Sequence, residues 1–225
     1  DTYDLSILII DDCSQDNTAE TARDFLGAGF WCPAVLLRNP VNLGYGGNQK
    51  VGYRYAIDNG FDVVALLHGD GQYAPECLPA LLRPFADDDD TGAVFGSRML
   101  DKRQALSGGM PLYKFLGNQI LTRFQNWLLG SHLSEFHTGY RVYSVAVLDE
   151  IPFELNTDDF HFDTEIIVQL FFLGRRVVEL PIPTHYGDEV CHVDGLQYAW
   201  NVSKASIKAR LIGLGIFYDP KFCPR

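Results

Sequence analysis

His68, Gly69 and Asp70 have the types and spacing of a cation-binding turn. They follow an apolar run at 63–67, and Gly69 and Gly71 permit a tight turn there. An imidazole nitrogen and a carboxylate oxygen two residues apart can converge on one cation, with coordination positions left open for phosphate oxygens. This donor set suits Mn²⁺ or Mg²⁺. A lone His-x-Asp is also common in ordinary turns, so the hypothesis needs support from elsewhere in the chain.

Two further polar clusters could contact a nucleotide. The adjacent Asp11 and Asp12 follow the apolar run at 5–10, and carboxylates at a strand end suit hydrogen bonding to a base or a ribose. Capping of the following helix would explain part of this cluster instead. The segment 42–50 is rich in glycine, which lets backbone approach an anion at a helix N-terminus. It lacks the G-x-G-x-x-G spacing, so a dinucleotide-binding site is a poor fit.

An α/β fold must position these clusters, because apolar runs of strand length alternate with segments of helical period. Continuous apolar runs indicate burial on both faces, hence a mostly parallel central sheet flanked by helices. Ligands in such sheets bind beyond the carboxyl ends of the strands. The predicted strands are 5–10, 34–38, 63–67, 93–96, 141–143 and 176–180. The predicted helices are 18–26, 47–58, 76–85, 113–129 and 164–173.

Length and charge exclude several classes of protein. The chain of 225 residues suffices for a single domain, and a net charge of −11 argues against a nucleic-acid partner. Five cysteines without C-x-x-C spacing indicate free thiols. No apolar run approaches the roughly 20 residues that a spanning helix needs, so we expect a cytoplasmic protein. The C-terminal helical segment at 194–215 mixes apolar and cationic residues. We favour its packing on the domain; the alternative is peripheral contact with the inner face of a membrane.

Taken together, the clusters resemble the family-2 glycosyltransferases of the GT-A fold, a Rossmann-like nucleotide-diphospho-sugar transferase fold. The similarity is greatest to the branch of polyprenyl-phosphate sugar transferases and dolichyl-phosphate mannose synthase. It covers nearly the whole chain. The stretches 9–16, 42–48 and 68–76 are similar to the family's V-D-D-x-S-x-D, N-x-G-x-G-x-N and D-x-D-x-Q-x-x-P-E motifs. The stretches 96–98 and 135–141 are similar to its G-S-R and D-x-x-S-G-[FY]-R elements, and 162–165 and 179–182 complete the order.

This resemblance implies an inverting transferase that moves a sugar from a nucleotide diphosphate, UDP- or GDP-linked, to a polyprenyl phosphate or a glycan. A divalent metal, Mn²⁺ or Mg²⁺, would bridge the diphosphate. Asp70 would bind it, and His68 is a plausible substitute for the aspartate that the family usually has there. The implied substrate-binding residues are Asp11, Asp12, Asn42, Gly44, Gln72 and Arg98.

The remaining candidates divide into arginines, carboxylates and one histidine. Arg98 and Arg141 could bind the diphosphate or an anionic acceptor, since guanidinium groups match phosphate oxygens; ion pairing is the alternative. Glu135 and Asp163 are candidate bases for a hydroxyl acceptor, although a phosphate acceptor needs none. Asp163 could instead cap the helix at 164–173. His192 is a candidate metal or phosphate ligand, or an ordinary surface histidine.

The resemblance also implies a strand and a P-x-Y-N-E motif upstream of residue 1. We therefore expect residues 1–225 to form a single but N-terminally incomplete domain, with a missing strand beside 5–10. Two rival functions are a non-catalytic nucleotide-sugar-binding protein and an NAD-dependent oxidoreductase. Metal-dependent transfer from a labelled nucleotide sugar would distinguish an enzyme from the first, and the absent dinucleotide motif argues against the second.

Overall fold

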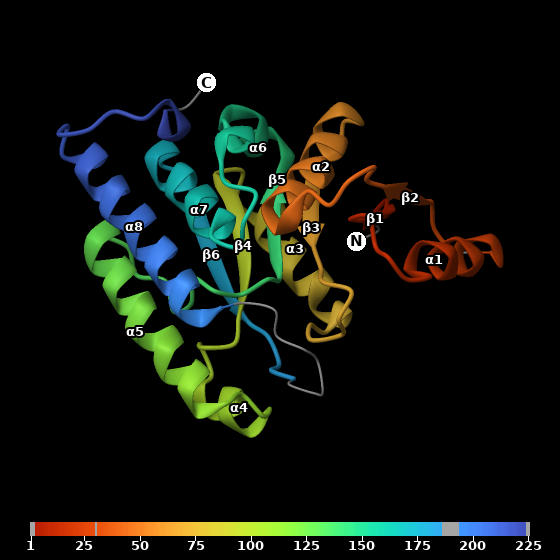
Figure 1. The fold of residues 1–225 in the computed structure, drawn as a ribbon, viewed down its shortest axis with the longest axis horizontal. Helices are drawn as coiled ribbons and strands as arrows, with labels where there is room; N and C mark the ends of the chain where they lie inside the picture. The colour runs from red at the N-terminus through yellow and green to blue at the C-terminus, as the bar shows by residue number, and fades with distance from the viewer. Residues whose placement is uncertain (1–2, 30, 186–193, 224–225) are drawn as a thin grey trace.

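The computed structural model describes residues 3–29, 31–185 and 194–223. They form the predicted α/β fold, with helices flanking a mostly parallel sheet (Figure 1). None of the helices within these ranges is long and apolar enough to cross a membrane. The four cysteines described, Cys13, Cys32, Cys77 and Cys223, are free thiols.

The larger sheet has four strands in the order β3-β5-β4-β6. These are β3 (Val63–Leu66), β5 (Arg141–Ser144), β4 (Thr91–Ser97) and β6 (Arg176–Pro181). Strands β3, β4 and β6 run in one direction and β5 runs against them. Every residue of β4 is buried, as its continuous apolar run predicts.

The strand register places the candidate chemistry along one edge of this sheet. Arg141 is the register partner of both Leu66 and Phe95, and Ser97 is the partner of Pro181. The carboxyl ends of β3, β4 and β6 therefore lie at the same edge as the first residue of β5.

The N-terminal strands form a separate, two-stranded sheet. β1 (Ile7–Asp11) pairs in parallel with β2 (Ala34–Arg38), and α1 (Thr18–Gly27) connects them. Within the described residues β1 pairs with no other strand, and Figure 1 shows this sheet set apart from the larger one. The strand expected upstream of residue 1 stays a prediction.

The helix α2 (Gly44–Asp58) joins the two sheets. It packs on β1, because a Cβ added at Gly52 would lie 3.3 Å from Cδ1 of Ile10. It begins three residues before the predicted start at 47, since the Asp12 carboxylate binds the backbone N–H groups of Leu43 and Gly44.

The other helices lie around the larger sheet (Figure 1). They are α3 (Leu78–Asp87), α4 (Lys102–Ser107), α5 (Leu112–Leu129), α6 (Val145–Glu150), α7 (Phe162–Leu173) and α8 (Gly195–Gly213). Three 3₁₀ turns span Pro75–Cys77, Phe153–Leu155 and Pro220–Phe222. Residues 162–170 of α7 are all buried, so this helix forms the centre of the helical layer. The helix α8 packs on α5 and α7 and buries Val202, Ala205, Ser206 and Ala209. Contact of the C-terminal segment with a membrane stays a prediction.

Candidate active site

The turn after β3 carries His68 with its ring directed into the protein. A Cβ added at Gly139 would lie 2.4 Å from the His68 Cε1, so only glycine leaves room for this ring. The imidazole also meets Tyr45 and Tyr73 edge-on, with ring centroids 5.7 and 5.5 Å away. Burial lowers the pKa of His68, which keeps the imidazole neutral at pH 7.

Asp70, in contrast, is exposed to solvent. Its Oδ1 accepts a hydrogen bond from the backbone N–H of Gln72 at 3.0 Å, and Gly71 at φ +75° makes the turn possible. The described part of the chain contains no cluster of three or more histidine, cysteine, aspartate or glutamate side chains that could hold a metal. Mg²⁺ and Mn²⁺ need only one or two protein carboxylates when substrate phosphates supply the other ligands. An exposed Asp70 fits such a site. The His68 Nε2 lies 3.4 Å from the Tyr45 hydroxyl instead, and His192 is outside the described residues.

Asp163 is a buried carboxylate in the first turn of α7. It accepts hydrogen bonds from the Tyr45 hydroxyl at 2.9 Å and from Nε2 of Gln49 at 3.3 Å. Its Oδ2 also lies 3.3 Å from Nη2 of Arg141. Both oxygens are therefore engaged by protein groups.

Arg141 is fully buried, and its contact with a phosphate group stays a prediction. Its Nε donates to the carbonyl of Thr138 and its Nη2 to that of Phe136, both at 2.8 Å. Burial acts to lower the pKa of Arg141, but the adjacent Asp163 outweighs it and raises the pKa, so the guanidinium stays charged. Arg141 thus holds Asp163 and the 136–138 backbone in place, and its side chain has no exposed surface.

Glu135 is also fully buried, and its role as a base for a hydroxyl acceptor stays a prediction. It binds the guanidinium of Arg98 and accepts from Nδ2 of Asn118 at 2.8 Å. Burial acts to raise the pKa of Glu135, but the charge and hydrogen bonds of Arg98 prevail and lower it. The predicted base therefore belongs to a buried ion pair, which favours its ionised form. The Arg98 side chain is 10% exposed, and its contact with a phosphate stays a prediction.

The residues predicted to contact the nucleotide form hydrogen bonds and an ion pair within the chain. The Asp12 carboxylate accepts from the backbone N–H of Leu43 at 2.9 Å and of Gly44 at 3.0 Å, so it occupies the start of α2. Asp11 is buried and lies 3.2 Å from Nε of Arg38. Asn42 binds the Asp12 carbonyl through Nδ2 at 3.2 Å. Asp12 thus binds the start of α2 and not that of α1, the helix that follows it, and base or ribose contacts stay predictions.

The glycines of the 42–50 segment serve a contact within the chain. Gly44 has φ +79°, and a Cβ there would lie 2.8 Å from the carbonyl oxygen of Asp158. A Cβ at Gly46 would lie 2.4 Å from the carbonyl oxygen of Thr157. The Gly46 N–H donates to the Asp158 carbonyl at 2.7 Å. Close approach of the 157–158 backbone accounts for these glycines, and the approach of an anion to this segment stays a prediction.

Four aromatic residues that the sequence did not single out complete the site. The Tyr73 hydroxyl accepts from the Gly139 N–H at 2.7 Å, and Tyr45 links His68 to Asp163. Burial raises the pKa of Tyr45 well above its ordinary value, so its hydroxyl keeps its proton. His137 lies 2.9 Å from the Tyr198 hydroxyl of α8. His137 and Tyr45 fall within motif stretches, but nothing local points to Tyr198.

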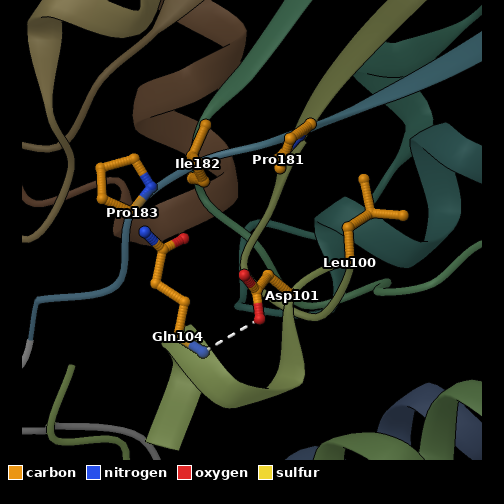
Figure 2. A pocket seen from close by; sticks show the side chains of 6 residues that line it. All are labelled: Leu100, Asp101, Gln104, Pro181, Ile182 and Pro183. Atoms are coloured by element: carbon orange, nitrogen blue, oxygen red, sulfur yellow. Dashed lines mark hydrogen bonds between the residues drawn. The ribbon is translucent and has the colours of Figure 1, made fainter. Parts of the chain in front are cut away.

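A hollow of about 630 Å³ lies beyond the carboxyl ends of β4 and β6 (Figure 2). Its lining is mostly apolar and contains none of the predicted site residues. Asp101 faces it but caps α4, accepting from the backbone N–H of Gln104 at 3.1 Å. The lining residues are Leu100, Asp101, Gln104, Pro181, Ile182 and Pro183.

The sequence of this chain matches a known protein family. The model of glycosyl transferase family 2 matches residues 1–151. The chain belongs to glycosyl transferase family 2. The order of motifs along the sequence predicts the same family, and the match confirms it.

The curated relatives of this family member include several polyprenyl-phosphate sugar transferases. This chain is 28% identical over 178 residues to the undecaprenyl-phosphate mannosyltransferase of Micrococcus luteus, and the match covers 78% of this chain and 70% of the relative. It is 25% identical over 194 residues to the UDP-N-acetylglucosamine–dolichyl-phosphate N-acetylglucosaminyltransferase of Methanococcus voltae, covering 82% and 76%. These relatives support the expected branch of the family.

Solved structures confirm the GT-A fold of the transferase. Mannosyl-3-phosphoglycerate synthase from Rubrobacter xylanophilus superposes with a TM-score of 0.64 at 18% identity, covering 95% of this chain and 66% of that one. Glucosyl-3-phosphoglycerate synthase from Mycobacterium tuberculosis, in complex with Mn²⁺, UDP-glucose and phosphoglyceric acid, superposes with a TM-score of 0.55 at 17% identity, covering 94% and 69%. At these identities the likeness establishes the fold alone.

Proposed function

We propose that this glycosyltransferase moves a sugar, with inversion, from a nucleotide diphosphate to a polyprenyl phosphate, assisted by a divalent metal at Asp70. The relatives named above act on undecaprenyl and dolichyl phosphates, which supports the acceptor class. The solved neighbour that holds Mn²⁺ with UDP-glucose supports the donor and the metal.

The metal part of this proposal depends on the ion pairing of Arg98 and Arg141. Arg98 is paired with Glu135, and Arg141 is paired with Asp163. Each guanidinium charge is already balanced by a carboxylate, so the pairs leave little net positive charge for a diphosphate. A protein of net charge −11 then needs a cation from outside. Asp70 presents an exposed carboxylate on the turn after β3, and a metal held there would supply Lewis-acid stabilisation of the departing nucleotide diphosphate.

The burial of Glu135 and the hydrogen bonds of Asp163 favour a phosphate acceptor. A hydroxyl acceptor needs a base that can reach it and take its proton. Glu135 has no exposed surface and a lowered pKa, and both oxygens of Asp163 are bound by Tyr45, Gln49 and Arg141. A polyprenyl phosphate is already ionised at pH 7 and can attack the anomeric carbon without such a base.

The remaining side chains position the site. The neutral His68 fills the space over Gly139, and Tyr45 connects it to Asp163 on α7. Arg141 fixes Asp163 against the start of β5. We assign the mostly apolar hollow beyond β4 and β6 to the acceptor, because an isoprenoid chain gains from apolar contact.

The metal assignment is tested by thermal shift with UDP or GDP, with and without Mn²⁺. Asp70→Asn should abolish the Mn²⁺-dependent stabilisation by nucleotide and leave the melting temperature of the free protein nearly unchanged, because Asp70 is exposed. Asp89→Asn, which changes an exposed aspartate between α3 and β4, is the matched control and should behave as the parent. Equal Mn²⁺-dependent shifts in Asp70→Asn and the parent would remove the metal from this turn.

The acceptor assignment is tested with a labelled UDP- or GDP-sugar. We expect label to pass to a polyprenyl phosphate and not to a soluble saccharide. Transfer to a saccharide hydroxyl alone would reverse the acceptor class. Tight nucleotide-sugar binding without any transfer would establish the rival reading, a non-catalytic binding protein.

A further inference from the structure

Glu179 is a half-buried carboxylate on β6 that has no role in the proposed function. Its Oε2 accepts a hydrogen bond from the backbone N–H of Ser134 at 2.7 Å. Its Oε1 accepts from the Ser134 hydroxyl at 2.6 Å and from the backbone N–H of Glu135 at 3.2 Å. Three donors from two consecutive residues therefore converge on one carboxylate, so Glu179 holds the start of the segment that carries Glu135.

Two hydroxyl groups connect this carboxylate to the end of β4. The Ser134 Oγ lies 2.7 Å from the Ser97 Oγ, and the Ser97 Oγ accepts from the backbone N–H of Met99 at 3.1 Å. An ionised carboxylate only accepts hydrogen bonds, so Ser134 donates to Glu179 and Ser97 must donate to Ser134. Every proton in this chain then has an acceptor. Glu179 is thus linked to both sequence neighbours of Arg98.

The backbone held in this way carries the buried ion pair of Arg98 and Glu135. The backbone N–H of Arg98 donates to the Glu135 Oε2 at 2.9 Å, and its Nε donates to Oε1 at 3.1 Å. The Nη2 of Arg98 also donates to the carbonyl of His137 at 3.0 Å. Because the guanidinium is bound by residues 135 and 137, a shift of the 134–135 backbone would move the guanidinium too.

The position of Glu179 is electrostatically unfavourable for a carboxylate. Burial raises the pKa of Glu179, and the charge of Glu135 adds to the rise, whereas the hydrogen bonds from the 134–135 turn act to lower the pKa. The three donors therefore favour the ionised form of a second carboxylate beside Glu135. A glutamine at position 179 would present its NH₂ group to at least one of these donors, and two donors cannot form a hydrogen bond with each other.

The same two strands lead to the hollow assigned to the acceptor. Pro181, two residues after Glu179, lines this hollow, and so does Leu100, two residues after Arg98 (Figure 2). Ser97 and Pro181 are register partners in the parallel pair of β4 and β6. A movement of Glu179 or Arg98 is therefore transmitted to the side of the site where the acceptor is expected.

We propose that Glu179 is a positioning residue whose carboxylate fixes the 134–135 turn and the end of β4, and thereby sets the direction in which Arg98 meets the phosphate of the acceptor. Glu179 itself contacts neither donor nor acceptor and acts through Ser134 and Glu135. This role rests on the proposed function, since it takes the acceptor phosphate as the partner of Arg98.

Hydrogen exchange tests the positioning without any substrate. The backbone N–H of Arg98 binds the Glu135 side chain, so its exchange rate reports where Glu135 lies. Glu179→Gln should speed the exchange of the Ser134 and Arg98 amides at least about tenfold. Glu150→Gln, which changes an ion-paired glutamate at the end of α6, is the matched control and should exchange as the parent. An Arg98 exchange rate equal to the parent's in Glu179→Gln would overturn the proposal.

Steady-state kinetics with farnesyl phosphate and a labelled UDP- or GDP-sugar test the effect on the acceptor. Glu179→Gln should raise the KM for farnesyl phosphate on the order of tenfold and change kcat and the KM for the donor by less than about threefold. A purely structural role would lower the folded fraction and leave each KM unchanged, and that outcome would overturn the assignment. Glu150→Gln again serves as the control.

A double-mutant cycle shows whether Glu179 acts through Arg98. Arg98→Lys keeps a counter-charge for Glu135 but loses the planar guanidinium. In that background Glu179→Gln should raise the KM for farnesyl phosphate little further, because both changes disturb the same contact. Equal fold-changes in the two backgrounds would overturn the route through Arg98. A parent that transfers no sugar would contradict the proposed function, and the exchange of the Arg98 amide would still decide whether Glu179 fixes the turn.

Discussion

The α-carbon of Gly139 lies directly under the imidazole of His68, so close that a methyl group there would sit 2.4 Å from Cε1. Gly139→Ala should therefore push the ring and the 68–70 turn outward, lower the free energy of unfolding by about 1–3 kcal/mol, and weaken Mn²⁺-dependent nucleotide binding. Gly117→Ala is the matched control, because nothing lies within 4 Å of the added methyl group in α5. Urea denaturation and thermal shift measure the two effects. A free energy of unfolding equal to the parent's in Gly139→Ala would show that the His68 imidazole does not lie over Gly139.

Asp12 caps the start of α2, and its removal should be felt as a loss of stability. Asp12→Ala deprives the N–H groups of Leu43 and Gly44 of their acceptor and should cost about 1–2 kcal/mol. Asp16→Ala, which removes an exposed carboxylate at the start of α1, should cost less. Nucleotide affinity, measured by titration calorimetry on folded protein, separates the two roles of Asp12. A large loss of affinity with unchanged stability would favour the base or ribose contact over the cap.

His137 should make stability depend on pH. Burial lowers the pKa of His137 to about 4, whereas an unperturbed histidine titrates near 6.5. Between these values the unfolded chain binds a proton that the folded chain does not. The free energy of unfolding therefore falls as the pH drops through this window, with a slope of up to about 1.4 kcal/mol per pH unit from this group.

Urea denaturation at several pH values between 4 and 7 measures that slope. His137→Gln should flatten it, and His132→Gln, at an exposed position, should not. Both variants keep Glu135, whose lowered pKa adds a slope of the same sign at more acidic pH. Identical slopes in the two variants would contradict the buried environment of His137.

Glu135→Gln and Asp163→Asn should lose stability rather than catalytic rate. Each leaves a buried arginine, Arg98 or Arg141, without its counter-charge, which should cost on the order of 3–5 kcal/mol. With a phosphate acceptor, turnover per folded molecule should stay within about tenfold of the parent. A loss of 10²–10⁴-fold in one variant at unchanged stability would identify a general base and hence a hydroxyl acceptor. Glu154→Gln, in the more exposed pair with Arg54, is the control.

Local sequence patterns predicted most of the framework. The strand at 34–38 has the bounds observed, and the apolar run at 63–67 ends one residue later than β3. The direction of β5 could not be read in this way, because apolar continuity reports burial and not the direction of a neighbouring strand. The short helices α4 and α6, at six residues each, show too little periodicity to detect.

The site was predicted by motif rather than by contact. Motif order draws attention to Arg98, Glu135, Arg141 and Asp163, but whether a charged side chain faces substrate or another charge depends on groups far along the chain. Glu135 finds Arg98 37 residues away, and Asp163 finds Arg141 22 residues away. The 42–50 glycines likewise match a backbone segment more than 100 residues downstream. Such pairings are made by the tertiary fold and leave no local trace.

The division of the strands into two sheets has a consequence for motion. No strand ladder within the described residues joins β1 and β2 to β3, so α2 and the Asp12 cap carry much of the connection. Amide hydrogens of β1 and β2 should then exchange with solvent through a local opening that leaves β4 and α7 closed. A nucleotide sugar that touches both Asp11 and the 68–70 turn would span the two parts and restrict their relative movement. Binding of the donor would therefore make the connection between the two sheets more rigid. While bound, the donor would act as a structural link between them.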